Sequence, residues 1–143
     1  MTASQLYRFD AQMESLEPAT AYVKAASAST GPMVALRAET ALEELLTNSV
    51  MHGSAPPDEP ASVWVSVTVA GQVMTLRFED ACAEFNPLLE IDAALERTRV
   101  PVEQRRPGGL GLLMVYRLAD GVRYTRENGH NCIELSFTER RVE

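Results

Sequence analysis

The spacing of hydrophobic residues changes along the chain, and this change separates helical from extended segments. From Pro32 to about Met51, apolar and small side chains recur every three or four residues, which is the period of an amphipathic helix. The members of this face are Ala35, Ala38, Leu42, Leu45, Leu46, Ser49 and Val50. We therefore predict a long helix over this segment.

Two later segments alternate between apolar and polar residues instead. Residues 62–69 and 73–79 have the two-residue period of strands, and Gly71-Gln72 between them predicts a hairpin turn. Further elements are predicted as a strand at 6–13, a helix entered at 16–18 and continued over 20–28, helices at 88–96 and 110–119, and strands at 122–126 and 132–138 around an Asn128-Gly129 turn. Together they predict an α+β two-layer sandwich, with helices on one face of a mixed, mostly antiparallel sheet.

Composition narrows the class of protein. The 143 residues favour a single domain, 1–143, and the net charge of -7 argues against a surface built to coat nucleic acid. No apolar run is long enough to predict a membrane span, and residues 1–10 do not resemble a secretory signal. Two cysteines are too few for a disulfide framework, so we expect a cytoplasmic protein.

The first candidate site lies on the long helix. Glu44 and Asn48 are four residues apart and therefore lie one above the other, away from the Leu42 and Leu46 side. The carboxylate can act as a base and the amide oxygen as a hard ligand for Mg²⁺. Taken alone, such a pair on the outer face of a helix is usually just solvated.

The second candidate site follows the strand that ends near Phe78. Asp80 lies at the strand end, where its carboxylate can accept a hydrogen bond from an exocyclic amine such as that of adenine. The segment continues through Cys82 and Phe85 to Pro87. An isolated Asp here is also compatible with an ordinary turn.

The third candidate site opens the helix that begins near Leu110. Gly108, Gly109 and Gly111 allow backbone N–H groups to approach an anion at a helix N-terminus. It is not a Walker A loop, because no Gly-Lys-Ser/Thr sequence follows. Arg105 and Arg106, just before it, would add positive charge, or would be solvated.

The order of these three motifs resembles the Bergerat-fold ATPases. The sequence contains E-x-x-x-N-x-x-x-H-G, then an Asp followed by F-x-P, then G-G-L-G-L. Within that superfamily the chain is most similar to the anti-sigma factor serine kinases. The resemblance extends over nearly the whole chain.

The resemblance implies a role for each matching residue. Asn48 would ligate the Mg²⁺ that bridges the ATP phosphates, Glu44 would be the catalytic base, and Asp80 would bind the adenine amino group. The remaining cofactor-binding positions are Cys82, Phe85, Arg105, Arg106, Gly108, Gly109, Leu110, Gly111 and Leu112. The implied cofactors are ATP or ADP with Mg²⁺.

The chain departs from the family at Cys82, where relatives have glycine. A side chain there can obstruct the backbone conformation and the close approach to adenine that glycine allows. We therefore expect a weaker or shifted adenine site, with a redox role for the thiol as a further hypothesis.

The resemblance also implies a function. It predicts a homodimeric serine kinase that binds a sigma factor and phosphorylates an anti-anti-sigma protein with a STAS domain, with no direct contact to nucleic acid or membrane. The alternative is a nucleotide-binding partner-switching module that has lost its catalysis. We do not expect a sensor histidine kinase fragment, since the 43 residues before Glu44 are too few for a phosphoacceptor helical hairpin.

Overall fold

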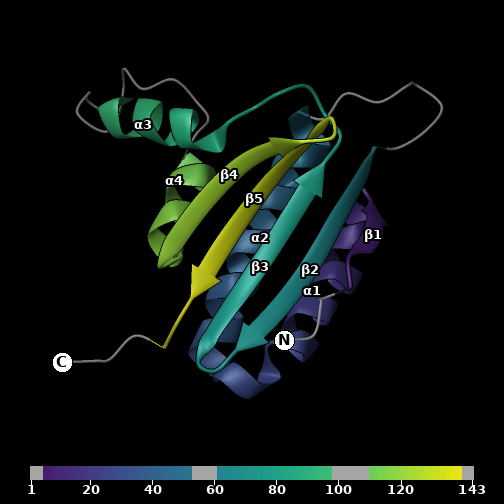
Figure 1. Ribbon diagram of the computed structural model, residues 1–143. Coiled ribbons are helices and arrows are strands. Elements are labelled where there is room, and N and C mark those ends of the chain that lie inside the picture. The colour runs from purple at the N-terminus through teal and green to yellow at the C-terminus, as the bar shows by residue number, and fades with distance from the viewer. Residues whose placement is uncertain (1–4, 53–60, 98–109, 140–143) are drawn as a thin grey trace.

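Five strands and four α-helices make up the protein in its computed structural model, which describes residues 5–52, 61–97 and 110–139 (Figure 1). In chain order they are β1 (Tyr7–Asp10), α1 (Leu16–Ala26), α2 (Pro32–His52), β2 (Ser62–Ala70), β3 (Val73–Asp80), α3 (Pro87–Arg97), α4 (Leu110–Leu118), β4 (Gly121–Glu127) and β5 (His130–Phe137). Short 3-10 turns precede α1 at Met13–Ser15 and follow it at Ala28–Thr30. The Gly- and Pro-containing composition of residues 53–58 predicts a loop, and this segment lies outside the described residues.

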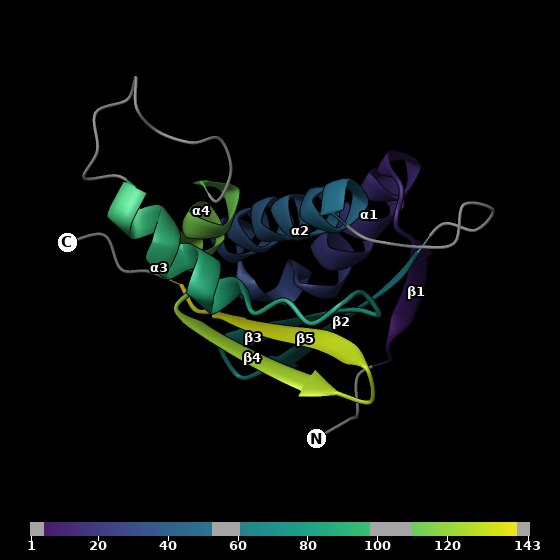
Figure 2. The same cartoon turned by 90° about the horizontal axis from the view of Figure 1, so that it is seen from above.

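The strands form one sheet in the order β1-β2-β3-β5-β4, and each of the four pairings is antiparallel. All four helices lie on the same side of this sheet, as the view from above shows (Figure 2). The predicted α+β sandwich is therefore confirmed. None of the helices in the described ranges is long and apolar enough to cross a membrane.

The core lies between the sheet and the helices. Alternation along the central strands turns every second residue, such as Val65 on β2 and Leu76 on β3, toward α2, which contributes Leu42 and Leu46. The same alternation runs through β5, where Leu135 is fully buried. It therefore decides which residues near the strand ends face the helices.

The two hairpins have the glycines that their turns require. Gly71 has φ 62°, and the closing hairpin has φ 52° at Asn128 and 78° at Gly129. Consecutive left-handed residues are typical of tight two-residue hairpins, for which Asn-Gly is a preferred sequence. Both predicted turns are therefore confirmed.

The first strand is shorter than the predicted 6–13. β1 pairs with β2 from Tyr7 to Asp10, and the chain then turns toward α1. Before the first residue of β1, which pairs with Val65, the Val67 N–H on the edge of β2 donates to the Tyr22 hydroxyl of α1 (3.0 Å). A side chain from the helix layer thus satisfies an edge group of β2 that β1 does not reach.

The sheet face away from the helices is polar. Arg77 forms ion pairs there with Glu79 (2.7 Å), Glu134 (2.8 Å) and Glu127 (3.4 Å). Trp64 lies on this face and stacks on His130 with ring centroids 4.6 Å apart. His130 is partly buried at the start of β5 because Trp64 and Glu79 cover it.

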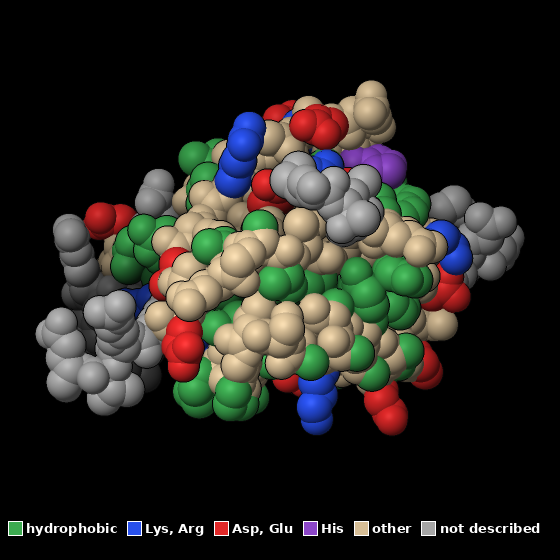
Figure 3. Space-filling view, turned by 60° about the horizontal axis from the view of Figure 1, so that its bottom comes forward, with side chains coloured by type: hydrophobic (Ala, Val, Ile, Leu, Met, Phe, Trp, Pro, Cys, Tyr) green, Lys and Arg blue, Asp and Glu red, His purple; other side chains and the backbone are tan. Residues whose placement is uncertain are grey.

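Exposed hydrophobic side chains occur at the lower end of the molecule in Figure 1. The start of α2 holds Met33 and Leu36 there, and the β2–β3 hairpin holds Val69 and Val73. Viewed toward that end, the surface shows hydrophobic groups among polar and charged ones (Figure 3). This distribution resembles that of an ordinary protein surface, where single apolar side chains are common.

A buried arginine joins the helix layer to the sheet. The Arg37 side chain on α2 donates to the carbonyls of Leu118 (2.9 Å) and Thr138, and forms an ion pair with Asp120 (3.3 Å). It also lies over the Phe137 ring, 5.7 Å from its centroid. These contacts connect α2 with the end of α4 and the end of β5.

Candidate functional site

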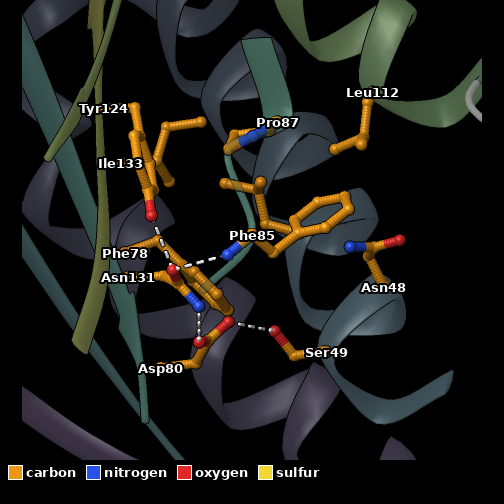
Figure 4. A pocket seen from close by; sticks show the side chains of 11 residues that line it. Asn48, Ser49, Phe78, Asp80, Phe85, Pro87, Leu112, Tyr124, Asn131 and Ile133 are labelled. Atoms are coloured by element: carbon orange, nitrogen blue, oxygen red, sulfur yellow. Dashed lines mark hydrogen bonds between the residues drawn. The ribbon is translucent and has the colours of Figure 1, made fainter. Parts of the chain in front are cut away.

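A pocket opens between α2 and the ends of the central strands, covered by the segment that leads into α3 (Figure 4). Its empty space is about 340 Å³ when the open solvent at its mouth is counted. Its lining residues are Leu45, Asn48, Ser49, Phe78, Asp80, Phe85, Pro87, Leu112, Tyr124, Asn131 and Ile133. Most of these side chains are apolar or aromatic, with a few polar groups among them, which is the usual composition of a small-molecule site.

Asp80 is the charged group of this pocket. It is the last residue of β3, and the alternation that buries Phe78 also turns Asp80 toward the helix layer. Its Oδ1 accepts hydrogen bonds from the Asn131 amide (2.9 Å) and the Cys82 N–H (3.1 Å), and its Oδ2 accepts one from the Ser49 hydroxyl (3.3 Å). The carboxylate is therefore held in a defined orientation.

The α2 residues divide between the pocket and its edge. Asn48 and Ser49 line the pocket, whereas Glu44, one turn earlier on the same helix, is not among the lining residues. The Glu44 carboxylate instead lies against Gly111, where an added Cβ would overlap its Oε2 atom. The pair predicted from the i, i+4 spacing is thus present, with Glu44 directed toward the start of α4.

The third motif lies partly within the described residues. Leu110 begins α4, Gly111 follows it, and the buried Leu112 lines the pocket. The other predicted cofactor-binding residues of this segment, Arg105, Arg106, Gly108 and Gly109, lie outside the described residues.

Cys82 occupies the position at which glycine was expected. Among the described residues other than glycine, Asn128 is the one with a positive φ, so Cys82 has a backbone conformation open to any residue. Its N–H donates to Asp80, and its carbonyl accepts from Arg126 (2.8 Å). The backbone strain that a side chain could cause at this position is therefore absent.

Asn131, Tyr124 and Ser49 line the pocket but were not predicted as site residues. Asn131 lies in the register of β3 and β5 directly opposite Asp80. A signal for it existed in the alternation of β5, because it is a polar residue at the inward position of a series that continues with Ile133 and Leu135. Polar residues at such positions often belong to sites or hydrogen-bond networks.

The polar groups fit a nucleotide with one bound metal ion. The apolar walls and the Asp80 carboxylate have the chemistry to hold a base with an exocyclic amine, because a carboxylate accepts hydrogen bonds from amines. Mg²⁺ is usually held by one or two protein oxygens together with phosphates and water, and the partly exposed Asn48 amide can supply one such oxygen. Within the described ranges, no group of three His, Cys, Asp or Glu side chains could hold a metal by itself.

Structural comparison places the fold among known proteins. The chain superposes on the structure of the RsbU and RsbW domains of Rv1364c from Mycobacterium tuberculosis with a TM-score of 0.63 and 18% identity, over 96% of this chain and 32% of that one. It also matches the histidine kinase domain of the blue-light activated histidine kinase EL346 from Erythrobacter litoralis, with a TM-score of 0.52 and 14% identity, over 86% and 60% of the two chains. The chain thus spans less than two thirds of either protein, and identities this low show a shared fold.

Sequence comparison identifies the family. No curated protein matches this chain. The family model of the histidine kinase-like ATPase domain, however, matches residues 9–137, from β1 to the end of β5. The resemblance read from the three motifs is thereby confirmed, and the chain belongs to the histidine kinase-like ATPase domain family.

Proposed function

We propose that this protein is a single-domain, ATP-dependent serine protein kinase that acts as an anti-sigma factor. The observation that carries the proposal is the meeting of Asn48 on α2 and Asp80 at the end of β3 in one pocket with apolar walls. These residues belong to different motifs, and each has the chemistry needed for one end of a nucleotide. Asp80 would accept a hydrogen bond from the adenine amine, and Asn48 would supply an oxygen ligand to Mg²⁺, which would neutralise phosphate charge.

The apolar walls of the pocket are proposed to bind the base. Phe85, Leu112 and Ile133 offer surfaces against which a purine ring can pack, while Asp80 distinguishes an amine from a carbonyl at its edge. Ser49 and Asn131 hold the Asp80 carboxylate, so that little reorientation is needed when the nucleotide binds. Preorganisation of this kind lowers the entropic cost of binding.

The chemistry is transfer of the γ-phosphoryl group to a serine hydroxyl. The serine oxygen forms a bond to phosphorus, the bond to the ADP oxygen breaks, and the serine proton passes to the Glu44 carboxylate. Bound Mg²⁺ supplies neutralisation of the phosphate charge. The residues of the chain contribute positioning and proton acceptance, which suffices because phosphoryl transfer depends mainly on geometry and charge.

The proposed partners are proteins. The kinase binds a sigma factor and phosphorylates a small anti-anti-sigma protein with a STAS domain, and it works as a cytoplasmic homodimer. The RsbW domain named in the mycobacterial structure shares the fold and supports this choice within the family. Arg105, Arg106, Gly108, Gly109 and Leu110 are proposed to complete the phosphate site.

Replacement of Glu44 by glutamine tests the proposed catalysis. Glu44→Gln keeps the shape and removes the base, so transfer to the serine of the STAS protein should fall by about 10²- to 10⁴-fold. ATP affinity should change less than about threefold, since Asn48 and Asp80 remain. Glu43→Gln is the matched control, because Glu43 is the exposed neighbour on the same helix.

The outcome also separates the kinase from a non-catalytic module. Glu44 does not line the pocket in this structure, an observation that favours the module as the second candidate. Transfer that is equal in Glu44→Gln and wild type would remove Glu44 from the mechanism. ATP binding by the wild type without transfer to its cognate STAS protein would favour the module.

A further inference from the structure

Asn131 is the centre of a hydrogen-bond network at the closed end of the pocket. It is buried, with 8% exposure, on β5 opposite Asp80. Its Nδ2 donates to Asp80 Oδ1 (2.9 Å) and to the Ala83 carbonyl (2.9 Å). Its Oδ1 accepts from the Phe85 N–H (3.0 Å), the Tyr124 hydroxyl (2.7 Å) and Arg126 (3.0 Å).

These five contacts define the orientation of the amide. Two acceptors face the nitrogen and three donors face the oxygen. An inverted amide would place its NH₂ group against the donors and its oxygen against the Asp80 carboxylate. The side chain at this position must therefore present a donor and an acceptor on the same planar group, which an asparagine does.

The network links two parts of the site that would otherwise be independent. One part is the Asp80 carboxylate, and the other is the segment from Ala83 to Phe85 that covers the pocket. Arg126 strengthens the second link, since it also donates to the Cys82 carbonyl (2.8 Å). Burial and the nearby Glu84 raise the pKa of Tyr124, so its hydroxyl remains a donor across the neutral range.

We propose that Asn131 is a positioning residue for nucleotide recognition, which holds the Asp80 carboxylate in its orientation while it fastens the 83–85 segment over the base. This inference rests on the proposed nucleotide function and adds to it a residue that need not touch the ligand. On this proposal, Asp80 is an effective acceptor for the base only while the residue at position 131 donates a hydrogen bond to its Oδ1. A residue of equal shape that lacks this donor should therefore impair recognition.

Asn131→Asp provides that test. The variant keeps the acceptor toward Tyr124, Phe85 and Arg126 but places a second carboxylate against Asp80 and the Ala83 carbonyl. Two carboxylates in contact do not both ionise readily, and one proton shared between them restores a donor. The deficit should therefore depend on pH, whereas a general loosening of the fold would not be relieved by acid.

The pH dependence of this test involves the charged and titratable groups around position 131. Asp80 on β3, Arg126 and the Tyr124 hydroxyl on β4, and Glu84 in the covering segment surround it. His130 and Glu79 pair with each other at neighbouring positions that alternate to the opposite sheet face. Arg126 keeps its charge throughout, so the pH series follows the protonation of the carboxylate introduced at position 131.

The experiment measures ATP affinity by calorimetry in the presence of Mg²⁺, at several pH values between 8 and 5.5, for wild type and variant. Protonation of ATP itself affects both affinities equally, so it cancels in their ratio at each pH. At pH 8 we expect Asn131→Asp to bind ATP about 10- to 100-fold more weakly than wild type. The ratio should shrink by about tenfold toward pH 5.5, as proton linkage requires.

Asn128→Asp is the matched control, with the same charge change at an exposed turn position of the same β4–β5 hairpin. Its affinity ratio should stay near one at every pH. Equal ATP affinity of Asn131→Asp and wild type at pH 8, or a large deficit that acid does not relieve, would overturn the positioning role. Wild type that fails to bind ATP would contradict the proposed function itself, and the positioning role with it.

A second variant decides the matter if Asn131→Asp does not fold, as judged by circular dichroism. Tyr124→Phe leaves the ring in the pocket wall and removes the hydroxyl that donates to Asn131. Its ATP affinity should fall by about 3- to 10-fold. Unchanged affinity in a folded Tyr124→Phe protein would then overturn the proposal.

Discussion

The carboxylate of Glu44 lies so close to Gly111 that a methyl group at that α-carbon would overlap its Oε2 atom. Glu44 extends from α2, and Gly111 stands in the first turn of α4. A carboxylate near a helix N-terminus is favourably placed, because the helix dipole is positive there. Glycine at this position is thus required by the approach of Glu44, a reason separate from any contact to phosphate.

Gly111→Ala should therefore impair catalysis through Glu44. The added methyl group displaces the carboxylate, and we expect phosphotransfer to fall by about 10- to 100-fold, as misplaced catalytic groups commonly cause. The measurement is the transfer rate to the STAS protein, with ATP affinity on the same preparation. Met114→Ala, at an exposed position of the same helix, is the control. Wild-type transfer by Gly111→Ala would show that the approach of Glu44 has no catalytic role.

Asp80→Asn should weaken nucleotide binding, because it removes the charged acceptor for the adenine amine. A charge-assisted hydrogen bond in a buried site contributes about 1.5–3 kcal/mol, so calorimetry should show about 10- to 100-fold lower ATP affinity. Asp10→Asn is the control, since Asp10 at the end of β1 pairs with the exposed Arg8. Unchanged affinity in a folded Asp80→Asn protein would refute the assigned role.

Cys82→Gly should leave ATP affinity within about threefold of wild type, because the Cys82 backbone already adopts an ordinary conformation and donates its N–H to Asp80. Its free energy of unfolding should fall by about 0.5–1 kcal/mol, since glycine increases the entropy of the unfolded chain. Thermal unfolding and calorimetry check the two expectations. Markedly tighter ATP binding would show that the thiol crowds the site after all.

Asp120→Asn should reduce stability in a pH-dependent way. Burial alone would raise the pKa of Asp120, but the Thr138 N–H (2.6 Å) and Arg37 hold it below its ordinary value of 3.8. A depressed folded pKa contributes stability above the ordinary value, and this contribution is lost as the pH falls through the folded pKa. We expect the free energy of unfolding of Asp120→Asn to be about 1–2 kcal/mol lower than that of wild type at pH 7, a figure that allows for solvent screening.

That difference should shrink toward zero in acid denaturation series carried below pH 3.8, the ordinary pKa of the group. Glu139→Gln, at an exposed position beside Thr138, should match wild type throughout and serves as the control. A deficit of Asp120→Asn that persists unchanged at low pH would mean that the carboxylate charge does not stabilise the fold.

Much of the architecture followed from local patterns. The period of the segment beginning at Pro32 predicted α2 to within a residue of its observed end at His52. The strict alternation of β2 and β3, with Gly71 between them, predicted that hairpin equally well. Such elements could be predicted because their residues report burial at a period set by the element itself.

The site was predictable only in part. The spacing of Glu44 and Asn48 placed both on one helix, and the strand pattern placed Asp80 at the end of β3. No local pattern could show that Glu44 approaches Gly111 while Asn48 faces the pocket, because that depends on where α4 packs against α2.

The sequence by itself determined the helices, the hairpins and the residue types available for nucleotide chemistry. Tertiary structure decided their partners: β5 pairs with β3 as well as β4, and this register sets Asn131 opposite Asp80. Likewise the buried Arg37 finds its acceptors at Leu118 and Thr138, far along the chain. The physical reason is that a local pattern records whether a side chain is buried, whereas the group it meets belongs to another element brought there by packing.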